Sequence, residues 1–444
     1  MLLIGNGLVF TCTEELGVIS DGGVLIEREK IVAVGKTDQL KEQYPGASYK
    51  DAGGKVVMPG MINTHMHLYS TFARGIDLKT NAAPRNFLEI LQQLWWRLDN
   101  RLNQADIYYS ALAALLAGIK KGTTTIFDHH ASFAVIDGSL DLIAEAVQQA
   151  GVRANLSYEV SDRQGRVKGQ AALRENERFI KMIQAGAEQD YLGGRIGLHA
   201  AFTLEDQTLE QATALADQLG VPFHLHTAEG RIDQVDSRER GYQGVIDRLN
   251  QYRIWRPGTL AIHGVHLQRE ELQVLAETGS YLIHNPESNM GNAVGAAPVA
   301  EALREGVTVG LGTDGYTADL FASIKAANLL QKHRQGDPRV GGNEVRTMAL
   351  LHNRQIASRC FQCELGSLRP GAAADLLLLD YSPPTPFTTA NALSHLLFGL
   401  SGDQVDTTIV GGKVLMEGRE VKVLDEEEIS RKTREQAADF WQRF

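Results

Sequence analysis

Two histidines one residue apart, His65 and His67, are the first residues in this sequence whose type and spacing could do chemistry. They end the stretch Val-Val-Met-Pro-Gly-Met-Ile-Asn-Thr-His-Met-His at residues 56–67. Successive side chains of a β-strand point to opposite faces, so the two imidazoles share a face. Such a pair can bind one metal ion, but a His-x-His on a surface strand usually has no function. The metal hypothesis therefore depends on which other residues meet the pair.

A repeat of strand and helix over residues 57–365 would position these histidines. The strand candidates lie near Val57–Asn63, Thr123–Asp128, Val152–Tyr158, Arg195–His199, Val221–His226, Thr259–His263, Ser280–His284 and Val307–Gly312. Between them lie amphipathic runs such as Ile107–Lys121, Leu140–Ala150, Leu209–Leu219 and Glu270–Glu277. Eight strands that alternate with helices predict a TIM (β/α)8 barrel, an α/β fold. A doubly wound open sheet is the alternative, but no Gly-x-Gly-x-x-Gly follows an early strand. We therefore favour the barrel.

Short strand patterns at both ends of the chain predict a second, smaller unit. Each end carries too few strands for a stable sheet of its own. We therefore expect one composite β-sandwich domain from residues 1–56 and 366–424, with the barrel inserted between its two parts. Residues 425–444 read as a C-terminal helix, because acidic residues fill its first turn and Arg443 lies near its end.

Composition excludes several classes of function. The chain has 444 residues and a net charge of −10, which argues against nucleic acid and against an anionic membrane surface as partners. No targeting segment is visible, and the longest apolar stretch is too short to span a bilayer. Three cysteines cannot form a disulfide framework, so a reducing, cytoplasmic location is expected.

Histidines and one aspartate recur at the C-terminal ends of the predicted strands. This face builds the active site in TIM-barrel enzymes. A single buried histidine often makes only hydrogen bonds, but a set at successive strand ends predicts a metal site. The set is His65, His67, His199, His226, His263, His284 and Asp314.

At this point the sequence resembles the amidohydrolase superfamily, in its branch of guanine, adenosine and triazine aminohydrolases. The matching motifs are residues 56–60 with His65-x-His67 and Arg74-Gly75, His224–Glu229, Ala261–Gly264, His284–Asn289, Gly312–Gly315 and Leu365–Leu376. They cover nearly the whole chain, in register with the predicted strands. Leu94–Asp99 and Asp128–Ser132 look most like the SsnA group of this branch, a group whose substrate the resemblance does not fix.

The resemblance implies one divalent metal ion held by His65, His67, His226 and Asp314. Three imidazoles and one carboxylate suit Zn²⁺, and Fe²⁺ is the alternative. Some superfamily members hold two metals bridged by a lysine of the fourth strand. That strand here reads Arg195–His199 and contains no lysine. We therefore expect a single metal.

The resemblance also implies three catalytic residues. Glu229 would take a proton from the attacking water and pass it to a ring nitrogen of the substrate. His263 would polarise the water and stabilise the developing oxyanion. Asp314 would act as ligand and proton acceptor, and would later protonate the leaving amine.

Substrate-binding candidates are His199, Asp99 and His129. His199 matches a histidine of the branch that contacts substrate, but the Pro and Tyr that follow it in the family are replaced. Asp99 either reads the polar edge of the substrate or is a helix-surface acid. His129 and His130 would point oppositely in a strand, so one of them could line the pocket. Trp95 and Trp96 diverge by about 100° on a helix, so at most one should face it.

The expected function is the hydrolytic deamination of a planar, aminated nitrogen heterocycle, purine-, pterin- or pyrimidine-like. One alternative is hydrolysis of a ring amide or an aryl halide by the same metal apparatus. Another is a catalytically silent scaffold, which is disfavoured because scaffold members lose metal ligands first, and here all of them are present. The resemblance further implies a homodimer.

Overall fold

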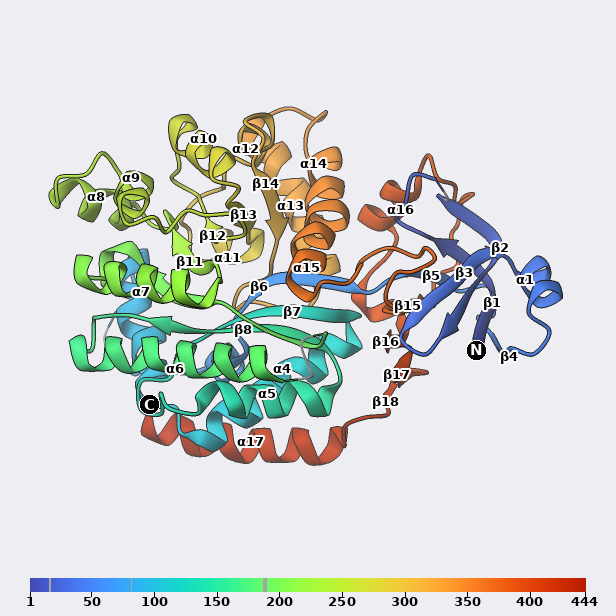
Figure 1. Cartoon of the computed structure of the whole chain (residues 1–444), viewed down its shortest axis with the longest axis horizontal. Helices are drawn as coiled ribbons and strands as arrows, with labels where there is room; N and C mark the ends of the chain where they lie inside the picture. Colours follow the sequence, from blue (N-terminus) through green and yellow to red (C-terminus); the bar gives the residue numbers. More distant parts are fainter. Residues whose placement is uncertain (16, 81, 187–189) are drawn as a thin grey trace.

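Eight parallel strands form the centre of the larger unit (Figure 1). The computed structural model spans residues 1–444 and describes all of them except 16, 81 and 187–189. Hydrogen bonds join the strands in the order β14-β13-β12-β11-β10-β8-β7-β6, and the short β9 (Leu192–Gly194) pairs with β8. Met66 bridges Asp314 and brings the two edges of the sheet together. The predicted barrel is confirmed. Its strands are β6 (Met61–Met66), β7 (Thr123–His130), β8 (Arg153–Val160), β10 (Ile196–Ala200), β11 (Phe223–Thr227), β12 (Leu260–His263), β13 (Tyr281–His284) and β14 (Thr308–Leu311).

Helices follow the barrel strands and cover the outside of the sheet. The four predicted helical runs correspond to α4 (Gln104–Lys120), α5 (Ser139–Ala150), α7 (Asp206–Leu219) and α10 (Arg269–Glu277). The others of the barrel are α2 (Phe87–Ile90), α3 (Trp96–Asp99), α6 (Arg166–Ala185), α8 (Arg231–Glu239), α9 (Val245–Gln251), α11 (Pro286–Gly291), α12 (Val299–Arg304), α13 (Leu320–Gln335), α14 (Gly342–Arg346) and α15 (Asn353–Phe361). None of the described helices is both long and apolar enough to cross a bilayer.

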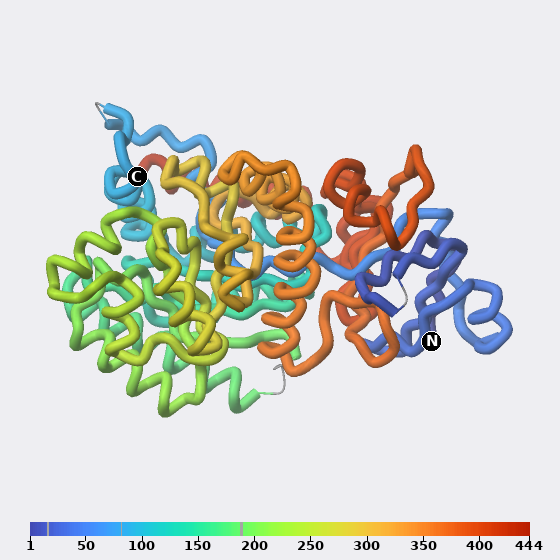
Figure 2. The backbone as a smooth tube through the Cα atoms, turned by 90° about the horizontal axis from the view of Figure 1, so that it is seen from above, coloured from blue at the N-terminus to red at the C-terminus, as the bar shows by residue number. Residues whose placement is uncertain are grey.

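Strands from both termini join in one sheet beside the barrel, as the two views show (Figures 1 and 2). The order is β18-β17-β16-β15-β5-β1-β2-β3, with β4 paired to β1. Most pairings are antiparallel, but β1 pairs with β4 and β5 in parallel. The strands are β1 (Leu2–Phe10), β2 (Val18–Glu27), β3 (Lys30–Lys36), β4 (Ser48–Asp51), β5 (Val56–Pro59), β15 (Leu376–Leu379), β16 (Val405–Val410), β17 (Lys413–Glu417) and β18 (Glu420–Val421). Two helices, α1 (Thr37–Gln43) and α16 (Ala392–Phe398), accompany them.

The strand predicted over Val57–Asn63 is two strands that belong to different sheets. β5 pairs with β15 of the terminal sheet, whereas β6 begins at Met61 and pairs with β7 of the barrel. The break falls at Gly60, where an added Cβ would lie 2.2 Å from the side-chain oxygen of Thr124. Only a residue without a side chain lets the strand pass this close to β7 as it changes sheets.

The predicted C-terminal helix is α17 (Glu426–Arg443), which runs along the barrel beneath α4 and α5 (Figure 1). Asp425 caps its first turn by accepting a hydrogen bond from the backbone N–H of Glu428. Near its end the Arg443 guanidinium lies 2.9 Å from the buried carboxylate of Asp106 on α4. Arg443 therefore fastens the C-terminal end of the helix to the barrel.

Candidate active site

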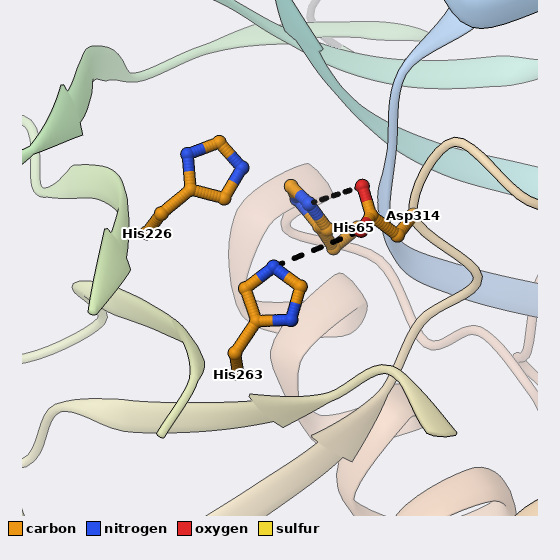
Figure 3. A group of neighbouring side chains, drawn as sticks. All are labelled: His65, His226, His263 and Asp314. Atoms are coloured by element: carbon orange, nitrogen blue, oxygen red, sulfur yellow. Dashed lines mark ion pairs between the residues drawn. The ribbon is translucent and has the colours of Figure 1, made fainter. Parts of the chain in front are cut away.

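Four imidazoles and one carboxylate meet at the C-terminal end of the barrel. Figure 3 shows three of these imidazoles, His65, His226 and His263, around Asp314. The Oδ1 atom of Asp314 lies 3.1 Å from His67 Nε2 and 3.5 Å from His65 Nε2, and its Oδ2 atom lies 3.7 Å from His263 Nε2. His226 Nε2 lies 3.2 Å from His67 Nε2. The structure thus brings together all four predicted metal ligands, with His263 beside them.

The far side of each ring is held by a second partner. His67 Nδ1 and His226 Nδ1 donate to the backbone carbonyls of His129 and His199, at 2.5 and 2.9 Å. Because a carbonyl can only accept, these Nδ1 atoms carry a proton, and Nε2 of each ring is the atom directed toward the centre of the cluster, where it offers a lone pair whenever the ring is neutral. Such outer hydrogen bonds orient histidine ligands in metal sites.

His65 and His263 are anchored by side chains. His65 Nδ1 lies 2.8 Å from Nε2 of His224, and His263 Nδ1 lies 2.8 Å from Oδ1 of Asn289. The Nε2 atoms of both rings are buried and have no hydrogen-bond partner. Buried polar atoms without partners are costly, and a cation at the centre of the cluster would satisfy both. The donor set therefore fits a divalent metal ion, and His224 orients the ring of His65 through its contact to Nδ1.

Two residues of the cluster have strained backbones. His263 has φ 74° and Asp314 has φ 55°, in the left-handed region that side chains other than glycine rarely adopt. Strain of this kind persists only where the surroundings enforce it, and it is concentrated at functional sites.

Burial and neighbouring charges shift the pKa values of the acids and bases of the cluster. Burial alone would raise the pKa of Asp314, but the neighbouring imidazoles of His65 and His67 hold it well below its usual value. Burial opposes protonation of His67, but Asp314 outweighs it and raises the pKa of His67 to about 9. Glu229 is buried near the charge of Asp314, so its pKa lies well above that of an ordinary glutamate. Asp314 thus stays ionised while Glu229 favours its protonated form.

A cavity of about 640 Å³, including its open mouth, lies over this cluster. It is bounded on one side by His67, His226, Glu229 and Asp314, and elsewhere by aromatic side chains and acids. The remaining lining residues include Tyr69, Phe87, Trp95, Trp96, Asp99, Glu159, His199, Phe202, Asp233, Asn292 and Tyr316. Flat aromatic walls around convergent polar groups suit a planar ring.

The prediction that at most one of Trp95 and Trp96 faces the pocket is wrong, because both line the cavity. Trp95 is the last residue of a π-helical turn, η2 (Leu91–Trp95), inserted between α2 and α3, and Trp96 is the first residue of α3. A π turn is wider than an α turn, so the angle between successive side chains is smaller than in an α-helix. Its effect is to enlarge the aromatic wall.

Two of the predicted substrate-binding residues reach the cavity. Asp99 is buried rather than on a helix surface, and it forms an ion pair with Arg163. Burial, only partly offset by Arg163, raises the pKa of Asp99 to about 6. His199 lies 2.8 Å from Thr203 Oγ1 through Nδ1 and 3.5 Å from the Glu159 carboxylate through Nε2.

The third, His129, is not among the residues that line the cavity, and neither is His130. The ring of His129 is fully buried and stacks on His226 at 4.9 Å with an interplanar angle of 4°. Strand β7 places this side chain behind the ligands. It supports His226 instead of facing a substrate.

Glu159, Arg163 and Asn292 belong to the site but are missing from the sequence-based candidates. Glu159 is the last residue but one of strand β8, so the strand-end rule that selected the histidines would have found it. Asn292 donates to Glu229 Oε1 at 3.2 Å, and Arg163 pairs with Asp99. Both lie in connections whose course is not encoded by a local pattern, so no sequence signal points to them.

Comparisons with known proteins agree with this geometry. The model of the Amidohydrolase family matches residues 56–415. The chain is 34% identical to a 5'-deoxyadenosine deaminase of Methanosarcina mazei, over 96% of this chain and 95% of the relative. It is 33% identical to a 5-methylthioadenosine/S-adenosylhomocysteine deaminase of Pelotomaculum thermopropionicum, over 98% of each.

Solved structures show the same fold. A zinc-bound adenosine deaminase of Xanthomonas campestris superposes with a TM-score of 0.87 at 24% identity, covering 100% of this chain and 99% of the other. A variant of the atrazine chlorohydrolase TrzN of Arthrobacter aurescens, complexed with zinc and atraton, superposes with a TM-score of 0.81 at 26% identity, covering 98% and 100%.

Proposed function

The chain belongs to the amidohydrolase family and is a hydrolase of carbon–nitrogen bonds other than peptide bonds, and on that premise we propose that it deaminates a planar, aminated heterocycle of the purine type. The observation that carries this proposal is the convergence of the His65, His67, His226 and Asp314 donors on one point, with Glu229 and His263 beside it. Water replaces the ring amino group, and the products are a ring carbonyl and ammonia. The relatives named as deaminases of adenosine derivatives support the purine type.

His65, His67, His226 and Asp314 would hold one divalent ion, Zn²⁺ before Fe²⁺. When bound, the ion supplies a Lewis acid that lowers the pKa of water toward neutrality. The anchored Nδ1 atoms of the three histidines keep their Nε2 atoms turned inward, so the donors do not have to reorganise when the ion binds.

Glu229 moves the proton between water and ring. Its Oε1 atom accepts from Asn292 and its Oε2 atom lies 3.4 Å from His263 Nε2, so the carboxyl group has a fixed orientation at the cavity wall. The raised pKa of Glu229 favours the protonated form, which is the form that protonates a ring nitrogen and makes the ring carbon more electrophilic.

His263 and Asp314 complete the transfer. His263 Nε2 lies between the carboxylates of Glu229 and Asp314, where it can orient the attacking water and stabilise the negative oxygen that develops at the tetrahedral ring carbon. Asp314 is ionised, so it can accept the second water proton and deliver it to the leaving amine.

The substrate ring would lie between the aromatic walls, with its polar edge toward His199 and Asp99. Both side chains line the cavity, and the Oδ1 atom of Asp99 is buried without a partner. We further propose that the protein works in the cytoplasm as a homodimer, on the family resemblance and on its three free cysteines.

Ammonia release from a substrate panel tests the proposal. The zinc-loaded protein would be assayed with 5'-deoxyadenosine, 5'-methylthioadenosine, adenosine, guanine, 8-oxoguanine, a pterin, cytosine and an amino-triazine. We expect ammonia from an aminopurine, lost in Asp314→Asn and retained in the matched control Asp21→Asn, which changes an exposed acid of the terminal sheet.

Other outcomes separate the alternatives. The protein could bind one equivalent of metal, release no ammonia from the panel and release halide from a chlorotriazine. This result would replace the proposed deamination by halide hydrolysis, the activity in the name of the TrzN relative. A protein that releases no ammonia and binds no metal would instead support the hypothesis of a catalytically silent scaffold.

A further inference from the structure

A second polar cavity lies at the opposite, N-terminal end of the barrel. It occupies about 1100 Å³, open to solvent, between the beginnings of strands β8, β10 and β12 and the end of helix α15. Ile356, Ala357 and Phe361 of α15 pack on Ile262 and Ile283 and close the barrel interior here, so the cavity has no connection to the metal cluster through this core. Its lining includes Asn155, Asp190, Arg195, Gly258, Arg359 and Cys360.

Arg195, in the wall of this cavity, is a buried cation without a counter-charge. Its side chain is 5% exposed, and Nη1 donates to the backbone carbonyl of Gly258. The guanidinium carbon lies 5.4 Å from the centre of the Phe127 ring. Nε is buried and has no hydrogen-bond partner. Neither a carbonyl nor an aromatic face neutralises a full charge, and a buried, unpaired charge is strongly destabilising.

The other two buried arginines of the described residues show what Arg195 lacks. Arg153 lies 2.8 Å from the carboxylate of Asp375, and Arg248 lies 2.8 Å from Asp206 and 3.2 Å from Asp236. In the part of the chain that the structure describes, no Asp or Glu pairs with Arg195. Burial accordingly lowers the pKa of Arg195, with only weak opposition from Cys360 and Tyr281.

Further groups of the same cavity complement Arg195. Arg359 donates a hydrogen bond to the hydroxyl of Tyr281, at 3.4 Å, and adds a second positive charge at the rim. The Oδ1 atom of Asn155 is buried without a partner, while its Nδ2 atom donates to Cys360 at 3.2 Å. Gly193 keeps the space open, because a Cβ there would lie 2.7 Å from Asn155 Nδ2.

We propose that this cavity is an anion-binding site in which Arg195 and Arg359 bind a small oxyanion, a phosphate or carboxylate group. The planar guanidinium suits such groups because its N–H donors match two oxygens at once. The unpaired acceptor on Asn155 suits the hydroxyl of a hydrogen phosphate. The site lies at the end of the barrel that carries stability in this fold, so its occupant would fasten α15 to the strands instead of taking part in the reaction.

Equilibrium dialysis with inorganic phosphate tests the proposal on the zinc-loaded full chain at constant ionic strength. We expect one saturable class of site, abolished in Arg195→Met and weakened at least about tenfold in Arg359→Gln, the loss of one charge-assisted contact. Arg166→Gln, an exposed arginine on α6, is the matched control and should bind like the wild type. Arg359 is exposed, so its variant decides the question even if Arg195→Met does not fold.

Two further experiments distinguish a phosphate from a carboxylate occupant, and this cavity from the metal cluster as the place of binding. Acetate that competes fully with phosphate would assign a carboxylate occupant, and phosphate binding that resists acetate would assign a phosphate group. Asp314→Asn should retain the phosphate, which excludes the metal cluster as its site and separates this result from the deaminase assay. Absence of saturable binding of either anion, or unchanged binding in Arg195→Met, overturns the proposal.

Discussion

The C-terminal end of the barrel and the core of the terminal sheet use buried positions in opposite ways. At the barrel end, the fully buried side chains of His65 and His263 have polar atoms with no hydrogen-bond partner. In the sheet, the core cluster is apolar throughout and includes Ile4, Val24, Val57, Leu376, Leu378 and Ile409. Apolar burial contributes stability, whereas buried polar groups cost it unless they find partners. The difference indicates that the sheet stabilises a molecule whose barrel end is adapted to chemistry.

Glu229→Gln should give the largest effect on the chemical side of this comparison. The amide keeps the size of the side chain but cannot shuttle a proton, so kcat should fall by about 10²- to 10⁴-fold. Metal content should change little, because Glu229 is outside the proposed ligand set, and the free energy of unfolding should not fall, because glutamine removes a buried acid whose pKa is raised. Steady-state ammonia release and metal analysis measure both.

The matched control for this change is Glu277→Gln, an exposed glutamate at the end of α10. A Glu229→Gln enzyme with near wild-type kcat would show that another group carries the proton.

Leu376→Ala should give the converse result in the sheet. Leu376 is fully buried between Pro59 of β5 and Ile409 of β16, and its loss leaves a cavity. The free energy of unfolding should fall by about 2–5 kcal/mol. The kcat of the folded fraction should stay near that of the wild type, since the sheet contributes no residue to the catalytic cavity.

Chemical denaturation and activity on the same samples check this prediction. Leu329→Ala on α13 removes an exposed leucine and should be nearly neutral. A large fall in kcat with unchanged stability in Leu376→Ala would contradict the division between the two regions.

The same contrast explains what could be predicted from the sequence. Alternating strands and helices give the barrel, and strand ends give His65, His67, His226, His263 and Asp314, because the end of a strand fixes where the next side chain points. The sequence did not predict the placement of side chains that depends on several helices, strands or loops at once. Both tryptophans reach the cavity through a π turn, and Arg163 meets Asp99 only because two separate connections converge. The break at Gly60 depends on Thr124, a residue of another strand.

Glu159→Gln should give the smallest of the three effects. This variant tests how much a buried acid at the barrel end lowers the free energy of unfolding. Burial, opposed by Arg163 and His67, raises the pKa of Glu159 from 4.5 to about 7. Between these values the folded protein keeps a proton that the unfolded chain has released. The free energy of unfolding should therefore decrease as the pH rises from about 4.5 to 7, and level off above it.

Glutamine cannot titrate, so the free energy of unfolding should fall less steeply with pH in Glu159→Gln. Between pH 5 and pH 8 the free energy of unfolding of the variant should exceed that of the wild type by about 1–3 kcal/mol. Denaturation curves across this pH range measure the gain, with the exposed Glu145→Gln as the control. If the free energy of unfolding fell with pH equally steeply in Glu159→Gln and in the Glu145→Gln control, Glu159 would be ionised in the folded protein. The negative charge of this carboxylate would then be balanced by Arg163, 4.0 Å away, and by His67, and its oxygens could only accept hydrogen bonds at the polar edge of the cavity.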